Sequence, residues 1–271
     1  MRLHFSVFII ASVTLLVAGR THAQMKPWNN SGVGLSGLSE PPKGPSGPAP
    51  RRDLSGIWDA GAGGIQPTGY DVAALFTPLG EKMAKANKPG NGPRIADVSE
   101  DNDPLSTLGD PAGFPRILLY ELRPFQIVQT ANQVLMLYMF EKRWRVIWTD
   151  GRELPKDPDP RWYGYSVGRW EDDYTLVVQS FGLDDRTWLD NAGNPHSASM
   201  RVEERYHRID GETLALTVTL EDPLIYTKPW TPLNKLPIRL MPNDTDLMEM
   251  VPSASEALAY RKEIASQAKT K

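Results

Sequence analysis

The chain has 271 residues, a formal net charge of −3 and no cysteine. The lack of thiols excludes disulfide bonds, thiolate metal sites and a cysteine nucleophile, so the hydrophobic core alone must hold the fold together. Basic residues form no run or stripe, which argues against nucleic acid as a partner.

Residues 1–23 have the pattern of a secretory signal peptide. Arg2 supplies a positive charge, residues 5–18 are apolar, and Thr21-His22-Ala23 is a small-residue cleavage pattern. The apolar run is about fourteen residues long, shorter than the roughly 20 that a membrane-spanning helix needs. We expect a periplasmic or secreted protein with no membrane span after cleavage; an uncleaved anchor helix is the alternative.

Residues 24–52 are rich in Pro, Gly and Ser and carry few apolar side chains, which predicts a disordered leader. One β-barrel domain is expected over residues 53–250. Its first strand should include Gly56-Ile57-Trp58, because Gly-x-Trp at such a place is familiar from lipocalin-like barrels, where the Trp closes one end. A strand with an ordinary core Trp fits the same residues.

A short helix is predicted within residues 75–86, beginning after Thr77 with Pro78 at its first position. Residues 87–115 then form a long, proline-rich irregular stretch. A loop of this length is uncommon in a compact domain unless it covers something, so we expect a lid. Its acidic cluster, residues 100–103, lacks the Gly and the final Glu of a calcium loop and is expected to be a solvated turn.

From residue 116 onward, short apolar runs recur with polar turns between them, which indicates an antiparallel barrel or sandwich. The clearest alternation predicts that Leu214, Leu216, Val218 and Leu220 point inward. A capping box, Ser253 to Glu256, predicts a helix within residues 251–271. The predicted strands are 117–122, 125–130, 134–140, 144–149, 174–180, 201–208, 213–221 and 237–241.

The segment Gly164–Gly168 matches the G-x-S-x-G motif of serine hydrolases. That motif works when a sharp strand-to-helix turn exposes the serine oxygen. A turn and a further strand follow here instead of a helix, so we interpret the match as chance.

The strand 201–208 gives the sharpest prediction of a site. Alternation places Val202, Glu204 and Tyr206 on the inward face, and an ionised carboxylate is costly there unless it is paired. Glu204 should therefore have a raised pKa or a fixed partner such as Arg145 or Arg186. A working acid and a structural ion pair both satisfy this expectation.

His196 lies in the loop before that strand. With Glu204, Asp184 and Asp185 it could form a general acid/base group or a mixed histidine and carboxylate site for a divalent metal. The spacing matches no established metal motif, and a turn histidine bonded to the backbone is the simpler alternative.

Asp150-Gly151-Arg152 follows the strand 144–149 and has the composition of a hairpin turn. Asp150 and Arg152 would lie at a sheet end near the tryptophans, some of which could line a pocket. The candidate catalytic residues are His196, Glu204, Asp150 and Arg186, and the candidate ligand-binding residues are Trp148, Arg152, Trp162, Asp184, Trp188 and Tyr206, with no metal ligand assigned.

Several segments together resemble one large family of exported proteins from soil and water bacteria, most of which have no assigned function. The resemblance covers about residues 53–251 and implies a β-rich, lipocalin-like fold without naming an activity. Members usually carry His at the position of Asn194, so this departure weakens a two-histidine metal site. The segments are DLSGIW (53–58), GFPRILLY (113–120), IWTDGR (147–152), DPRWYGYSVGRWEDDYTLVV (159–178), DDRTWLDNAGNPHS (184–197), EERY (203–206) and DPLIYTKPW (222–230).

The favoured function is the binding of a small apolar or aromatic ligand in a barrel lined by Trp and Tyr, with Glu204 and an Arg fixing its orientation. The alternative is a periplasmic hydrolase, lyase or isomerase on the same scaffold, with His196 or Glu204 as the base and Arg152 or Arg186 stabilising negative charge. A structural protein of the cell envelope is a third hypothesis.

Overall fold

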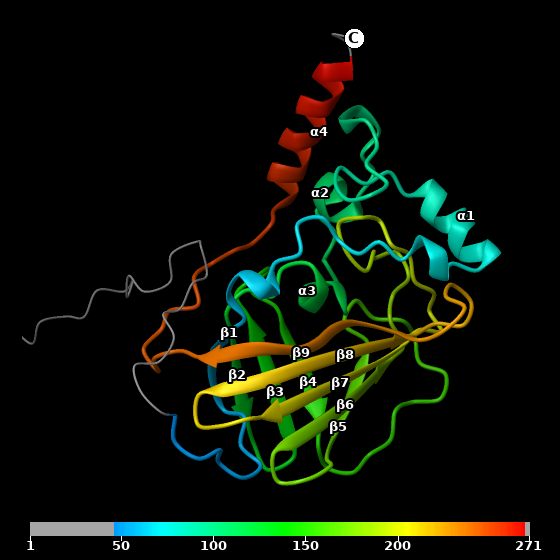
Figure 1. The fold of residues 1–271 in the computed structure, drawn as a ribbon. Helices are drawn as coiled ribbons and strands as arrows, with labels where there is room; N and C mark the ends of the chain where they lie inside the picture. Colours follow the sequence, from blue (N-terminus) through cyan, green and yellow to red (C-terminus); the bar gives the residue numbers. More distant parts are fainter. Residues whose placement is uncertain (1–45, 269–271) are drawn as a thin grey trace, which may run out of the picture.

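The chain folds into a closed nine-stranded β-barrel in a computed structural model that describes residues 46–268 (Figure 1). The strands follow one another round the barrel in chain order, and β1 closes on β9. All neighbours are antiparallel except β4 and β5, which run parallel. The strands are β1 (Gly56–Asp59), β2 (Phe125–Gln129), β3 (Gln133–Tyr138), β4 (Trp144–Trp148), β5 (Tyr165–Trp170), β6 (Thr175–Phe181), β7 (Arg201–Arg208), β8 (Thr213–Glu221) and β9 (Trp230–Leu240).

This confirms the predicted mainly-β class, and the arrangement is consistent with a lipocalin-like barrel. The predicted signal peptide and most of the predicted leader lie outside the described residues. Within the described part of the chain, no helix is both long and apolar enough to cross a membrane.

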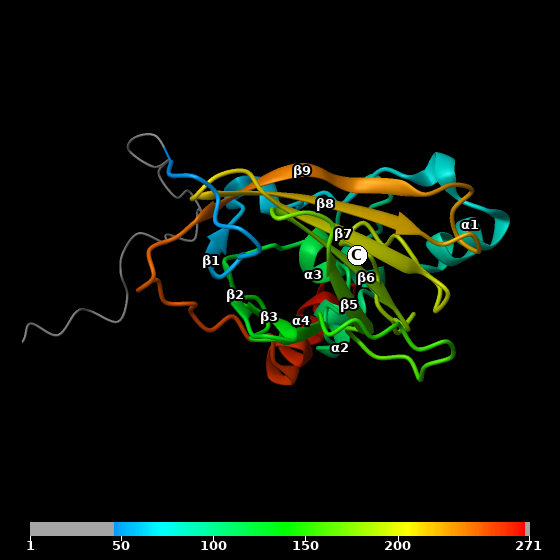
Figure 2. The ribbon, with the colours of Figure 1, turned by 90° about the horizontal axis from the view of Figure 1, so that it is seen from below.

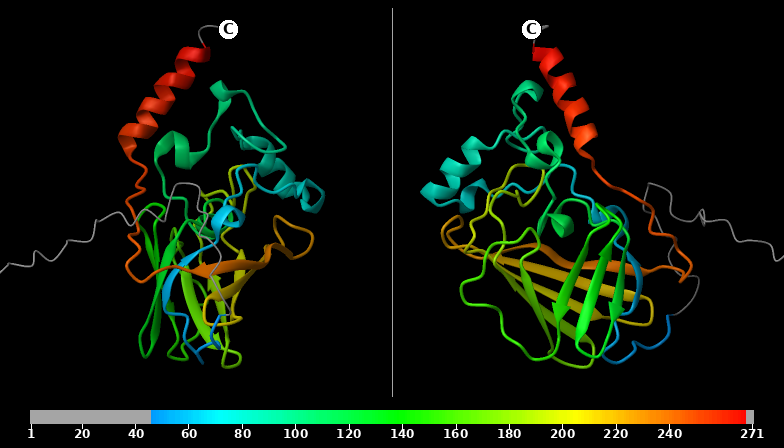
Figure 3. Two further views of the ribbon diagram at one scale, coloured as in Figure 1. Left: turned by 60° about the vertical axis from the view of Figure 1, so that its left-hand side comes forward. Right: turned by 180° about the vertical axis from the view of Figure 1, so that it is seen from behind.

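The helices gather at one end of the barrel (Figures 1 and 3). α1 begins as predicted, because the side-chain oxygen of Thr77 accepts the Gly80 N–H at 3.1 Å and Pro78 is the first helical residue. The helices are α1 (Pro78–Ala86), α2 (Pro104–Leu108), α3 (Arg116–Leu119) and α4 (Ala254–Ala268), with 3₁₀ turns at Gly61–Gly64, Ala73–Leu75 and Val98–Glu100.

The C-terminal helix α4 begins with the predicted capping box. Ser253 Oγ accepts the Glu256 N–H at 3.3 Å, and a carboxylate oxygen of Glu256 accepts the Ser253 N–H at 3.0 Å. The Tyr260 hydroxyl donates to Asp101 at 2.7 Å, which ties α4 to the stretch predicted as a lid.

The expectation of a solvated acidic turn is wrong for Asp103. Its carboxylate is buried, caps α2 by accepting the Leu105 N–H, and pairs with the buried guanidinium of Arg116. An ionised pair can be buried in this way because each charge finds its partner within the protein.

The predicted strand 117–122 is also wrong, because these residues begin in α3. Ile117, Leu118 and Leu119 are all buried. A short run that is apolar at every position has no periodicity from which a helix and a strand could be told apart. α3 lies over the barrel end in Figure 2, where it appears behind the ring of strands.

Strand β9 is longer than predicted and includes Pro232 and Pro237. Proline is unfavourable in a central strand because it has no backbone N–H to donate. However, β9 pairs with β1 only through Arg239 and Leu240, so the residues of β9 before Arg239 have no strand partner on that side.

The barrel interior is filled by side chains. The four inward residues predicted on β8 are all fully buried, which confirms that alternation. Trp58 is also fully buried; its indole N–H donates to the Leu54 carbonyl at 2.9 Å, and Arg208 stacks on its ring. The interior near this end is therefore a packed core.

Candidate functional site

Glu204 lies fully buried inside the barrel, as predicted, and it has a fixed arginine partner. Both of its carboxylate oxygens accept from the guanidinium of Arg145, one of them at 3.1 Å, and the Tyr206 hydroxyl donates to it at 2.7 Å. The partner is Arg145 on β4, and Arg186 pairs elsewhere. Of the two alternatives predicted for Glu204, a working acid or a structural ion pair, this arrangement matches the ion pair.

The guanidinium of Arg145 is held on all sides. Its Nε donates to Ser166 Oγ at 3.1 Å, and the ring of Phe114 lies 4.0 Å away. Burial alone would lower the pKa of Arg145, but the charge and hydrogen bond of Glu204, together with Tyr138 and Tyr206, outweigh this, so the pKa is raised. Burial also raises the pKa of Tyr206, and Glu204 raises it further. Both tyrosine and arginine therefore stay protonated as donors to the carboxylate.

The segment Gly164–Gly168 is not a nucleophile elbow. Ser166 is a buried residue of β5 that hydrogen-bonds Ser180 Oγ at 2.9 Å, and β6 follows in place of a helix. A side chain at Gly168 would place its Cβ 2.9 Å from Ile147 on β4, so this glycine lets the two strands approach.

His196 is fully buried in a different network. Its Nε2 lies 2.8 Å from Thr187 Oγ1, and its Nδ1 lies 3.2 Å from the Ser197 carbonyl oxygen. Burial lowers the pKa of His196, although Asp222 and other acids oppose the shift, so the neutral ring is favoured. It shares no hydrogen-bond partner with Glu204, and the described residues contain no cluster of three potential metal ligands.

The loop that carries His196 is organised by two residues that the sequence analysis did not select. Asp190 is fully buried and accepts hydrogen bonds from the Tyr70 N–H at 2.8 Å and from the Asn194 side chain at 2.7 Å. Asn194 in turn accepts from Arg94 at 2.9 Å. The side chain of Asn194 thus links Asp190 to Arg94. The repeated Asp and Asn residues around Gly193 are the feature of the sequence that indicated a hydrogen-bonded turn here.

Two exposed arginines each fold back onto an aspartate two residues earlier and stack on a tryptophan. Arg152 lies 3.5 Å from the ring centre of Trp148 and bonds Asp150. Arg186 lies 4.3 Å from the ring centre of Trp162, and its Nε donates to Asp184 at 2.9 Å. The hydrogen bond from each arginine lowers the pKa of its aspartate. Neither pair forms a hydrogen bond to Arg145 or Glu204 in the described part of the chain, and Trp188 is buried beside Arg116.

The expected tryptophan-lined interior is not what the structure shows. On β4, Arg145 and Ile147 point into the barrel, whereas Trp144 points out and is 65% exposed. The side chains of this strand alternate between the two faces, but the apolar face is the outer one, because Arg145 pairs with the buried Glu204 on the inner side. Trp148 lies on the same outer face as Trp144.

The outer aromatic residues line a cleft of about 520 Å³ between β4 and β5. The two strands pair through one Cα partnership, Trp148 with Val167, so the barrel wall opens beside it. The lining also includes the strand residues Arg145 and Ser166, whose side chains are buried in the barrel interior. The remaining lining is Trp144, Val146, Arg152, Glu153, Leu154, Pro155, Arg161, Tyr163, Gly164 and Tyr165.

Much of this lining comes from the connection between β4 and β5, residues 149–164. Of the candidates predicted there from the sequence, Arg152 lines the cleft, whereas Asp150 and Trp162 do not. A connection this long is unsuited to a tight hairpin, and parallel neighbours need a long crossover. The length of this connection is therefore the feature of the sequence that indicated a parallel pair of strands, joined by a segment that lies over the outside of the barrel.

No protein-family model, curated protein or solved structure matches this chain. The resemblance to the exported bacterial family therefore stays a prediction.

We predict that Glu204→Gln lowers the free energy of unfolding by about 3–5 kcal/mol, because it leaves the charge of Arg145 buried without its partner. Chemical denaturation measures the change. Glu203→Gln, on the outer face of the same strand, is the matched control and should cost no more than about 0.5 kcal/mol. Equal losses in the two variants would contradict the burial of the pair.

The lowered pKa of His196 predicts a dependence of stability on pH. Below about pH 6.5 the unfolded chain binds a proton that the folded ring rejects, so the free energy of unfolding should fall as the pH falls. Thermal melts between pH 8 and about pH 5 would show a smaller decline in His196→Asn. His207→Gln, an exposed position on β7, should keep the full decline. An unchanged slope in His196→Asn would count against this role.

Proposed function

We propose that the protein is an exported binding protein that takes a small aromatic compound with an anionic group into the cleft between β4 and β5. The observation that carries this proposal is the combination, in one opening of the barrel wall, of four aromatic rings with arginine side chains. The cleft volume lies within the range of about 300–1,000 Å³ that is usual for small-molecule sites.

The aromatic rings supply the apolar part of the site. Trp144 and Trp148 come from β4, and Tyr163 and Tyr165 lie across the opening. The indole of Trp144 is 65% exposed and lines one cleft with the other three rings, and an exposed aromatic patch of this kind is typical of a ligand-binding surface. Flat rings of a ligand would stack against these side chains.

The arginines favour a negative group on the ligand. Arg152 and Arg161 are held in place by stacking on Trp148 and Tyr165, with guanidinium-to-ring distances of 3.5 and 4.2 Å. Arg161 has no acidic partner within salt-bridge distance in the described part of the chain, so its donors are available to a carboxylate or sulfonate. A stacked guanidinium loses little freedom when it binds such a group.

Binding is favoured over the hydrolase, lyase or isomerase alternative by the placement of the polar residues. His196 and Glu204 are both fully buried and bonded within separate networks, so they would not meet on one substrate. Asp150 and Arg186, the other candidates, form ion pairs with Arg152 and Asp184 on two different segments. The signal-peptide pattern of residues 1–23 supports export.

The proposal can be tested with anilinonaphthalene sulfonate, a fluorescent aromatic anion. Trp148→Ala should weaken its binding by about tenfold, through the loss of one stacked ring in the cleft. Arg161→Ala should weaken it as well, whereas neutral naphthalene derivatives should lose less.

Trp162→Ala is the matched control, since this ring stacks on Arg186 and does not line the cleft. It should leave the affinity of the dye unchanged. If the control variant loses binding and Trp148→Ala keeps it, the cleft is not the site. Melting temperatures of all variants identify any that are misfolded, to which this dye also binds.

A further inference from the structure

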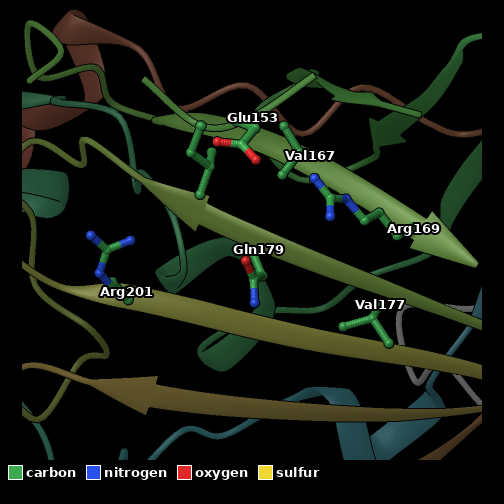
Figure 4. Close-up of a pocket in the computed structure, with 7 residues that line it drawn as sticks. Glu153, Val167, Arg169, Val177, Gln179 and Arg201 are labelled. Atoms are coloured by element: carbon green, nitrogen blue, oxygen red, sulfur yellow. The ribbon is translucent and has the colours of Figure 1, made fainter. Parts of the chain in front are cut away.

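A second cavity, of about 370 Å³, lies on the outer face of β5, β6 and β7 beside the aromatic cleft (Figure 4). Its floor consists of outward side chains of the three strands, and Glu153 and Leu154 reach it from the connection 149–164. The floor residues are Val167, Arg169, Val177, Gln179 and Arg201.

The strand register sets the two arginines at opposite ends of this floor. Arg169 is level with Val177 on β6, and Gln179 is level with Val167 one row further on. Arg201 lies one row beyond Gln179, where it stacks on Phe181 at 4.5 Å. The two arginine Cα atoms are thus separated by four residues along the strands, about 13 Å, and by two strands across, about 10 Å. Figure 4 shows Gln179 between them.

The arginines of this floor differ from a neighbouring arginine in their ion pairing. Arg205, on the same outer face but outside the cavity, pairs with both Glu171 and Glu203. Arg169 and Arg201 have no acidic partner within salt-bridge distance among residues 46–263, whose side chains the structure describes. The two arginines that line the cavity therefore lack the ion pairs that Arg205, outside it, makes.

The floor between the two cations is mixed, with valine side chains beside the polar amide of Gln179. Val167 lies across from Gln179 on β5, and Val177 lies two residues before Gln179 on β6. Leu154 adds a further apolar side chain from the connection 149–164. An extended chain with a polar group at each end fits such a surface, because its middle covers the valines while its ends reach the guanidinium groups.

We propose that this cavity is a second ligand site for an elongated organic dianion of the linear dicarboxylate type. One carboxylate pairs with Arg169 and the other with Arg201, while the carbon chain lies along the valines and Leu154. Glu153 is the one acid of the lining, and its charge opposes the ligand. The site adjoins the aromatic cleft and shares Glu153, Leu154 and Val167 with it, but neither arginine lines that cleft.

Isothermal titration of the full protein with linear dicarboxylates, from succinate to sebacate, and with monocarboxylates of equal length tests the inference. The best-fitting dicarboxylate should bind about fivefold more tightly than its monocarboxylate counterpart, as one additional exposed charge pair would give. Arg169→Ala and Arg201→Ala should each remove this preference. Arg205→Ala, on the same face but outside the cavity, should keep it.

Glu153→Gln provides a variant with the opposite expected result. It removes a like charge and should tighten dicarboxylate binding, which a misfolded protein would not do. An absence of any preference for the dianion, or equal effects of Arg201→Ala and Arg205→Ala, would overturn the inference. Binding of anilinonaphthalene sulfonate should be unchanged in Arg169→Ala and Arg201→Ala, so the two sites succeed or fail independently.

Discussion

The guanidinium of Arg145 joins four neighbouring strands inside the barrel at the place where the wall has fewest backbone contacts. From β4 it reaches Tyr138 on β3, Ser166 on β5, Ser180 on β6 and Glu204 on β7. The backbones of β4 and β5 share a single Cα partnership, so this side-chain network spans a gap in the hydrogen-bonded ladder. Its charge is tolerated inside because Glu204 neutralises it and Phe114 covers it.

The parallel junction has consequences for the outer surface. Since β5 runs in the same direction as β4, residues 149–164 must return along the outside of the barrel before β5 can begin. This crossover forms one wall of the aromatic cleft and one wall of the cavity with Arg169 and Arg201. Both proposed sites therefore depend on the parallel pairing of β4 and β5, while the barrel interior is filled by packed side chains.

Features governed by short-range rules could be predicted from the sequence. Alternation gave the inward position of Glu204, because a strand buried on one face repeats every two residues. Alternation alone does not predict which face of β4 points outward. Trp148 lies on the outer face because Arg145 occupies the inner one, and the charge of Arg145 is stabilised there by Glu204, almost sixty residues away in the sequence. Likewise, residues 117–119 are buried on all sides by distant segments, and such a run carries no period that separates a helix from a strand.

Amide hydrogen exchange on the double variant Arg145→Met/Glu204→Leu tests most directly whether this ion pair holds the seam. Replacing both charges by apolar groups should keep the barrel folded, since no buried charge is left alone. The amides of β4 and β5 should then exchange faster than in the unmodified protein, with β7 and β8 unchanged. Protection that is unchanged at the seam, or lost uniformly round the barrel, would contradict the role given to Arg145.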